Sequence, residues 1–259
     1  MEADSYRVLA RFYDAAYSKA DLRDIPFYVD LAERVGGPVL EVGCGTGRVL
    51  LEVAARGIEI DGLDSSEDQL RVLQAKLDGP CAGVRDRIRL HRQDMRTFSL
   101  DRRFRLITAP FRPVQHLYTV RDQIAAFRTI HKHLLPDGRF AFDAFYPKYE
   151  MLDADMDVEK PDFEWADPEV PGRMVRRYFV RESIDKLNQL FSGRFLFRVF
   201  DGDTLVSEER EQIRLSYYTY PQFLLLFELC GFRVLEEYGS FAREPIGICK
   251  EMIFVLGCA

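Results

Sequence analysis

The sequence predicts an α/β fold in which a mainly parallel sheet carries helices on both faces and an antiparallel β meander is inserted. From Pro38 to Phe145, short apolar runs alternate with amphipathic helical patterns, as is typical of βαβ units. From Arg173 to Tyr218 the alternation gives way to long β-like runs separated by turn residues, and a helical pattern resumes at Tyr220. We therefore expect one domain over residues 1–259, with a lid loop and β meander over residues 148–218 inserted into it.

The individual elements follow from periodicity and from helix start and stop signals. We expect Thr46 to cap the helix that follows the first strand, and Ser65–Asp68 has the form of a capping box for the next helix. Residues 148–171 are acidic, punctuated by proline and without periodicity, which predicts a long loop. The expected strands are 38–42, 58–63, 87–91, 104–109, 139–145, 232–237 and 249–256, and the clearest further helices are 22–35, 122–135 and 220–230.

Composition is that of a globular protein, with 47% hydrophobic residues, 30% charged residues and a formal net charge of -6. Five cysteines are scattered without a C-x-x-C pair, which indicates reduced thiols. His131 and His133 are two residues apart at a helix end and cannot share a face, so we expect no metal site. The N-terminus lacks an apolar signal core, and no apolar stretch is long enough to span a bilayer. We expect a cytoplasmic protein with no membrane partner.

The main chemical signal is a glycine-rich turn between a strand and a helix, Glu41-x-Gly43-x-Gly45-x-Gly47. Such a turn lets the backbone approach a nucleotide closely, and an acid at the end of the next strand, here Asp64, can bind both ribose hydroxyls. The third glycine of the dinucleotide pattern G-x-G-x-x-G is missing, and so is a phosphate-binding G-x-x-x-x-G-K-[ST] loop. Glu41 disfavours a pyrophosphate and favours a ligand with a cationic end.

These segments resemble, in order, the motifs of class I S-adenosylmethionine (SAM) dependent methyltransferases. VLEVGCGTGR (39–48) is similar to the first motif, GLDSSEDQL (62–70) to the second, QDMRTF (93–98) to the third, and HLLPDGRFAFDAF (133–145) to the approach to the fifth strand. The resemblance implies a Rossmann-like fold with a seven-stranded sheet, SAM as cofactor and S-adenosylhomocysteine (SAH) as product. In this family Asp64 would hold the ribose, and Asp94 with Met95 would frame the adenine. The cofactor contacts that we expect are Tyr13, Glu41, Gly43, Gly45, Arg48, Asp64, Ser65, Asp94, Met95 and Phe111.

The methyl acceptor should lie over the carboxyl ends of the strands, lined by the segment after the fourth strand, residues 109–116. This segment lacks the [DN]-P-P-[YF] motif of nucleobase methylases, and we expect no nucleic-acid partner. His116 is a candidate general base, with a simple backbone contact as the alternative. The FYDAAY segment at Phe12–Tyr17 resembles one found in small-molecule N-methyltransferases, in which a tyrosine folds over SAM. Tyr13 is therefore a second candidate catalytic residue, with plain packing of an amphipathic helix as the alternative.

The sequence predicts a methyltransferase that acts on N or O of a small molecule, similar to the aminosugar or glycine type. In such enzymes the insertion covers the acceptor or forms a dimer interface, which makes a homodimer possible. Two alternatives stay open. Eight arginines stand against three aspartates in residues 85–105, so this face can serve an RNA or protein methyltransferase. The second alternative is a SAM-binding protein without catalytic activity, because Arg105 stands where the family usually has an aspartate.

Overall fold

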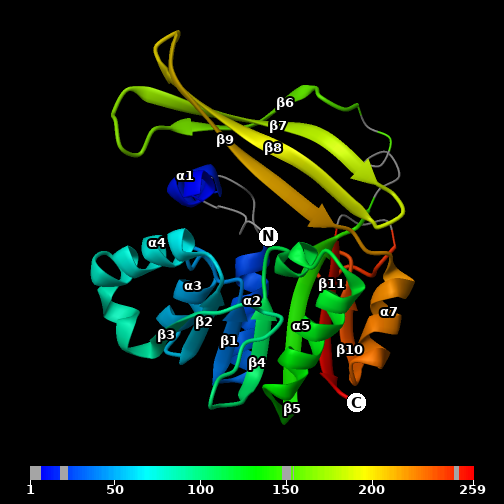
Figure 1. The fold of residues 1–259 in the computed structure, drawn as a ribbon. Coiled ribbons are helices and arrows are strands. Elements are labelled where there is room, and N and C mark those ends of the chain that lie inside the picture. The colour runs from blue at the N-terminus through cyan, green and yellow to red at the C-terminus, as the bar shows by residue number, and fades with distance from the viewer. Residues whose placement is uncertain (1–6, 18–22, 148–152, 154, 248–250) are drawn as a thin grey trace. The chain divides into compact units, whose positions relative to one another are not determined.

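The computed structural model describes residues 7–17, 23–147, 153, 155–247 and 251–259. The chain divides into two compact units. Residues 23–147 and 217–259 form the first, which carries the alternating strands and helices (Figure 1). Residues 1–22 and 148–216 form the second, which carries helix α1 (Arg7–Tyr17) and an antiparallel sheet. The N-terminal helix therefore belongs with the insertion rather than with the strand–helix alternation.

The first unit is built on a seven-stranded sheet. In spatial order its strands are β10 (Phe232–Tyr238), β11 (Glu251–Cys258), β5 (Leu134–Phe145), β4 (Phe104–Ala109), β1 (Val39–Val42), β2 (Ile60–Asp64) and β3 (Ile88–Arg92). The five strands β1 to β5 pair in parallel, while β11 runs antiparallel to both of its neighbours. This arrangement confirms the predicted Rossmann-like, mainly parallel sheet. It also brings the carboxyl ends of β1, β2, β4 and β5 to one edge.

Helices lie on both faces of this sheet (Figure 1). They are α2 (Asp24–Val35), α3 (Leu50–Ala55), α4 (Glu67–Asp78), α5 (Val120–Lys132) and α7 (Tyr220–Leu229), with the short 3-10 turns η1 (Ala82–Arg87) and η2 (Pro113–His116). The predicted cap of α4 is confirmed, because the Ser66 hydroxyl accepts the N–H of Gln69 at 3.3 Å. The predicted cap of α3 by Thr46 is wrong. Gly47 has a left-handed φ of 86°, so the chain enters the helix only at Leu50.

The core of the first unit consists of two apolar layers, one on each face of the seven-stranded sheet. Because side chains alternate along a strand, Leu40 and Val42 join one layer and Val39 joins the other. The first layer is rich in phenylalanine and lies under α5 and α7, while the second lies under α2, α3 and α4. The strands in the middle of the sheet are buried on both sides, which explains why they appear in the sequence as continuous apolar runs.

The second unit is a four-stranded antiparallel sheet with α1 packed against it. Its strands, in spatial order, are β6 (Glu159–Ala166), β7 (Arg173–Asp185), β8 (Leu190–Asp201) and β9 (Thr204–Ser216). Phe12 of α1 is fully buried and stacks on Phe197 of β8 with ring centroids 5.5 Å apart. The amphipathic helix thus buries its aromatic face within its own unit. A homodimer formed through this insertion stays a prediction.

One expectation for the insertion is wrong, since part of the predicted long loop is a strand. Within residues 148–171, β6 pairs with β7 along its length. Pro161 lies in β6, where the register shifts between Pro161 and Phe163. An edge strand tolerates a proline and exposed acidic side chains because only one side has to pair, and such a strand lacks the usual apolar alternation. Residues 148–152 and 154 of the predicted loop lie outside the described residues.

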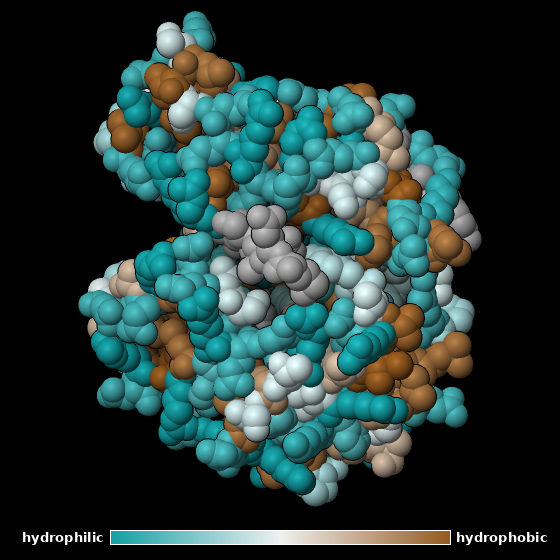
Figure 2. Space-filling model, viewed as in Figure 1, coloured by the Kyte–Doolittle hydropathy of each residue, from teal (hydrophilic) through white to brown (hydrophobic). Residues whose placement is uncertain are grey.

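Helix α7 has an apolar outer face. Figure 2 shows brown side chains gathered over α7, where Leu225 and Leu229 are 69% and 55% exposed. Exposed leucines are ordinary on a protein surface and do not by themselves identify a partner. In the part of the chain that the structure describes, no helix is long and apolar enough to cross a membrane.

Candidate active site

The glycine loop leaves the carboxyl end of β1 and has a backbone that only glycine adopts easily. Gly43, Gly45 and Gly47 have φ angles of 72°, 54° and 86°. A Cβ on Gly43 would lie 2.7 Å from the ring of Pro113, and one on Gly47 would lie 2.4 Å from Leu73. The loop is therefore both left-handed and tightly enclosed, and the predicted need for glycine at these positions has a steric cause.

Asp64 ends β2, as expected, and its carboxylate holds the glycine loop from the side. Oδ2 accepts the N–H of Gly45 at 2.9 Å, and Oδ1 accepts the N–H of Ser66 at 2.8 Å. Burial raises the pKa of Asp64 above its ordinary value, against the backbone N–H groups that favour the charged form. A carboxylate has about four lone-pair sites, so acceptor capacity remains for the hydroxyls of a ligand.

Glu41 lies in β1 directly before the loop and is 2% exposed. Burial raises the pKa of its carboxyl to about 8, although Arg48 and the N–H of Leu50 favour the charged form. Among the residues that the structure describes, Oε2 of Glu41 and Oε1 of Gln69 are buried acceptors without a hydrogen-bond partner. Oε1 of Gln69 lies 3.4 Å from the position of a Cβ on Gly45. Two unsatisfied acceptors thus border the glycine loop.

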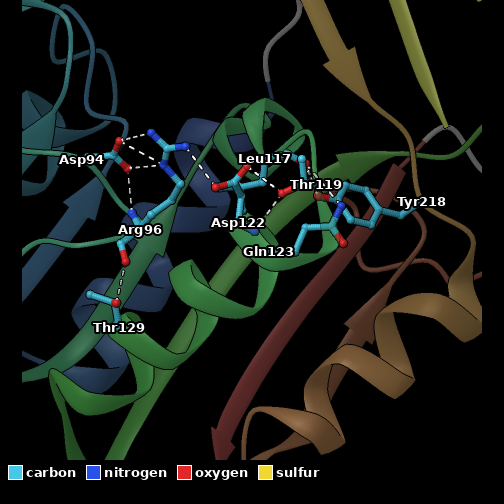
Figure 3. Close-up of polar contacts among 8 residues, drawn as sticks. All are labelled: Asp94, Arg96, Leu117, Thr119, Asp122, Gln123, Thr129 and Tyr218. Atoms are coloured by element: carbon cyan, nitrogen blue, oxygen red, sulfur yellow. Dashed lines mark hydrogen bonds and ion pairs between the residues drawn. The ribbon is translucent and has the colours of Figure 1, made fainter. Parts of the chain in front are cut away.

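The turn after β3 is held by an arginine between two acids. Nε of Arg96 donates to Oδ1 of Asp94 at 2.9 Å, and Nη1 donates to Oδ1 of Asp122 at 3.0 Å (Figure 3). Asp122 lies in the first turn of α5, whose N-cap Thr119 donates its hydroxyl to Oδ2 of Asp122 at 2.8 Å. The hydrogen bonds from Arg96 hold the pKa of Asp94 below its usual value. The neighbouring Met95 packs against the phenylalanine-rich layer. The third motif is in this way tied to the start of α5.

The segment after β4 is strained. Phe111 and Arg112 have left-handed φ angles of 63° and 72° in succession. Such a conformation costs a non-glycine residue about 1–3 kcal/mol and persists only where the surroundings impose it. The turn η2 follows and ends at His116, which is half-buried, with Nδ1 3.4 Å from the hydroxyl of Tyr118. The structure thus places His116 in a turn just beyond the carboxyl end of β4.

Arg48 is committed to contacts within the protein. It forms a bidentate ion pair with Asp24, the first residue of α2, at 2.9 and 2.5 Å. Its guanidinium also lies over the ring of Phe111, 4.9 Å from the centroid. The side chain therefore links α2, the glycine loop and the segment after β4.

Known proteins resemble this chain in sequence and in fold. A family model described as a methyltransferase domain matches residues 39–138. The chain is 26% identical over 253 residues to the putative methyltransferase YqeM of Bacillus subtilis (strain 168), covering 96% of this chain and 95% of that protein. A solved S-adenosylmethionine-dependent methyltransferase from Clostridium acetobutylicum ATCC 824 superimposes with a TM-score of 0.78 at 18% identity, covering 98% and 99% of the two chains. Residues 39–138 are thus a methyltransferase domain, and the chain has the fold of class I SAM-dependent methyltransferases.

A further relative is named for an aminosugar substrate. The chain is 32% identical over 143 residues to the dTDP-3-amino-3,6-dideoxy-alpha-D-glucopyranose N,N-dimethyltransferase of Streptomyces fradiae. The match covers 53% of each of the two proteins.

The methyltransferase site fits SAM. A buried glutamate oxygen without a donor suits a ligand that brings N–H groups and positive charge, since an unpaired buried acceptor is costly. SAM carries an ammonium and a sulfonium and no phosphate. The turns that hold Gly43, Asp64 and Asp94 lie at the carboxyl ends of β1, β2 and β3, where ligands bind in open α/β sheets.

The structure also shows where the other predicted residues of the methyltransferase lie. Ser65 follows Asp64 at the start of the turn into α4. Tyr13 belongs to the other compact unit, where its ring packs against Tyr17 with centroids 4.7 Å apart. Its predicted contact with SAM stays a prediction.

The arginine-rich segment 85–105 is extensively paired with acids of the same unit. Arg85 pairs with Asp78, Arg92 with Glu67, and Arg102 with Asp61 at 3.3 Å. Ion pairs of this kind cancel much of the positive field that a polyanion would meet. The structure therefore gives the RNA alternative less support than the composition of the segment suggested.

Asp143, which holds the segment after β4, is not among the residues predicted from the sequence. Asp143 of β5 is 1% exposed, and its Oδ1 accepts the N–H of Phe111 at 2.8 Å and the hydroxyl of Tyr28 at 2.7 Å. Burial raises the pKa of Asp143 to about 7, with the charge of Glu251 adding to the effect. The signal was present in RFAFDAF (139–145) as a lone acid within a buried strand, since buried acids need partners.

Proposed function

We propose that this methyltransferase transfers the methyl group of SAM to a nitrogen of a small molecule of the aminosugar class. The observation that carries the proposal is the 32% identity, over 143 residues, to the Streptomyces fradiae aminosugar N,N-dimethyltransferase. Two features of the site agree with it. The segment after β4 lacks a nucleobase motif, and it presents a histidine.

The cofactor side of the proposal rests on the glycine loop and the acids around it. Glu41 would bind the cationic amino-acid end of SAM, and the backbone of Gly43 and Gly45 would contact the cofactor as well. Asp64 and Ser65 bind the ribose, and Asp94 with Met95 encloses the adenine. Phe111 would line the cofactor pocket, and Arg48 would contribute by holding the Phe111 ring through a cation–π contact rather than by binding SAM directly.

When bound, SAM supplies an activated methyl carbon that is open to in-line displacement. The protein must align the acceptor nitrogen with that carbon and exclude water. An ammonium acceptor has no lone pair, so a base has to remove one proton before or during transfer. We propose that His116 accepts this proton and that the hydroxyl of Tyr118 orients its ring. Tyr13 is proposed to close over the cofactor.

The test is a methyl-transfer assay that measures SAH formation with three sets of acceptors: dTDP-aminosugars, short RNA and peptides. We expect turnover with the first set. His116→Gln should lower kcat by about 100-fold, the usual share of a general base, while SAM affinity measured by calorimetry stays within about twofold. His131→Gln is the matched control, because His131 packs against Phe232. Turnover of RNA or peptide alone, or equal effects of the two substitutions, would contradict the proposal.

A further inference from the structure

The segment after β4 is stabilised by contacts with residues from other parts of the chain. Phe111 and Arg112 are consecutive non-glycine residues at φ 63° and 72°, a conformation that the chain does not keep by itself. Three contacts bear on it from distant parts of the sequence. Asp143 accepts a hydrogen bond from the N–H of Phe111. Glu251 accepts one from Nη2 of Arg112 at 2.5 Å. The guanidinium of Arg48 covers the Phe111 ring.

Among these contacts, only the bond to Asp143 acts on the backbone of the strained residues. Oδ1 of Asp143 receives the Phe111 N–H and the Tyr28 hydroxyl at the same time. A side chain with 1% exposure in the middle of the sheet cannot move to follow a relaxing loop. The position of the Phe111 amide is therefore fixed by β5.

The same segment touches the cofactor loop. Pro113 follows Arg112 and lies so close to Gly43 that a Cβ there would be 2.7 Å from its ring. Gln115 is fully buried, and its Oε1 accepts the N–H of Phe145 at 3.1 Å. His116 comes next. A shift of the Phe111 backbone would therefore displace Pro113, which contacts the glycine loop, and also His116, which lies further along the same segment.

We infer that Asp143 is a positioning residue for methyl transfer, which holds the Phe111–Arg112 backbone and thereby places Pro113 against the glycine loop and His116 toward the acceptor. The part of this inference that concerns His116 rests on the proposed function. The part that concerns the glycine loop does not, and SAH affinity reads it independently of turnover.

The experiment compares Asp143→Leu, Asp143→Asn and Tyr28→Phe. Leucine removes the acceptor, whereas asparagine keeps an oxygen that can accept both bonds. Tyr28→Phe removes the other donor at the same buried carboxylate and leaves the Phe111 bond, which makes it the matched control. The measurements are SAH affinity by calorimetry, SAH formation, and hydrogen exchange of the Phe111 amide by NMR.

We expect Asp143→Leu to weaken SAH binding by about 10-fold, to lower kcat by about 100-fold, as a displacement of about 1 Å does, and to expose the Phe111 amide to exchange. Asp143→Asn and Tyr28→Phe should stay within about threefold in both quantities, with the amide protected. The inference is overturned if Asp143→Leu binds SAH normally, or if Asp143→Asn is as impaired as Asp143→Leu. If Asp143→Leu does not fold, loss of amide protection in Asp143→Asn overturns it, and retained protection supports it. If the variants change SAH affinity as expected but the wild-type protein methylates no aminosugar, the result contradicts the proposed function alone.

Discussion

Two loops at the same edge of the sheet reach left-handed backbone conformations by different means. The glycine loop uses Gly43, Gly45 and Gly47, which adopt positive φ without a steric penalty. The segment after β4 places Phe111 and Arg112 in the same region of φ and is held there by Asp143, Arg48 and Glu251. One loop is shaped by its own residues and the other by its neighbours. A loop of the first kind can be recognised in a sequence, while one of the second kind cannot.

Gly43→Ala should break the first loop and have the largest effect. The new Cβ meets Pro113 at 2.7 Å in a left-handed backbone, so strain and overlap together destabilise the protein by about 2–4 kcal/mol. SAM binding should become undetectable in calorimetry. Gly57→Ala is the control, because Gly57 has φ 83° with open space around it, and should cost about 1 kcal/mol in urea unfolding with unchanged affinity. Equal effects of the two substitutions would mean that the contact with Pro113 is unimportant.

Asp64→Ala tests the acid that supports the glycine loop from β2. It removes the acceptor for the N–H groups of Gly45 and Ser66 and the proposed partner of the ribose. We expect SAM affinity to fall by about 1–3 kcal/mol, since charge-assisted hydrogen bonds are lost. Calorimetric titration with SAM measures the change. An unchanged dissociation constant would remove Asp64 from the site.

The pH dependence of stability sharpens the contrast, because each loop has a buried acid with a raised pKa. The pKa values in the folded protein are about 8 for Glu41 and about 7 for Asp143, against ordinary values of 4.5 and 3.8. The folded state therefore holds protons that the unfolded chain releases, and stability falls as pH rises from about 4 toward 8, by up to about 1.4 kcal/mol per unit for each group. The groups that face Asp143 are Tyr28 and Asp24 of α2, Arg112 and Glu251.

Asp143→Asn should flatten this slope up to about pH 7, and Glu41→Gln should flatten it up to about pH 8, in urea unfolding measured from pH 5 to pH 8.5. Each substitution keeps an acceptor oxygen and removes one titrating group. Parallel curves for the wild type and Asp143→Asn would show that Asp143 keeps an ordinary pKa.

The sequence determined the parallel sheet, and it predicted the cofactor half of the site, because both rest on local patterns. Short apolar runs predicted β1, β2, β3 and β4 close to their observed bounds, and the polar cap at Ser66 marked the start of α4. The predicted start of the fifth strand at residue 139 and the predicted end of the preceding helix at residue 135 were wrong, because β5 begins at Leu134, which pairs with Phe104 of β4. Local patterns failed where local chemistry is weak. β6 is an exposed edge strand with a proline, and Gly47 delays α3 although Thr46 is a good capping residue type.

Only the tertiary structure showed the partners of the segment after β4. Asp143 lies 32 residues from Phe111 and 115 residues from Tyr28 along the chain, so no spacing links them, and each taken alone is an ordinary residue of a strand, a loop or a helix. Glycine carries its conformational freedom in its own covalent structure, and a motif made of glycines can therefore be recognised in the sequence. A strained Phe–Arg pair is stable only because burial fixes a carboxylate opposite its amide, and that arrangement exists only once the sheet has formed.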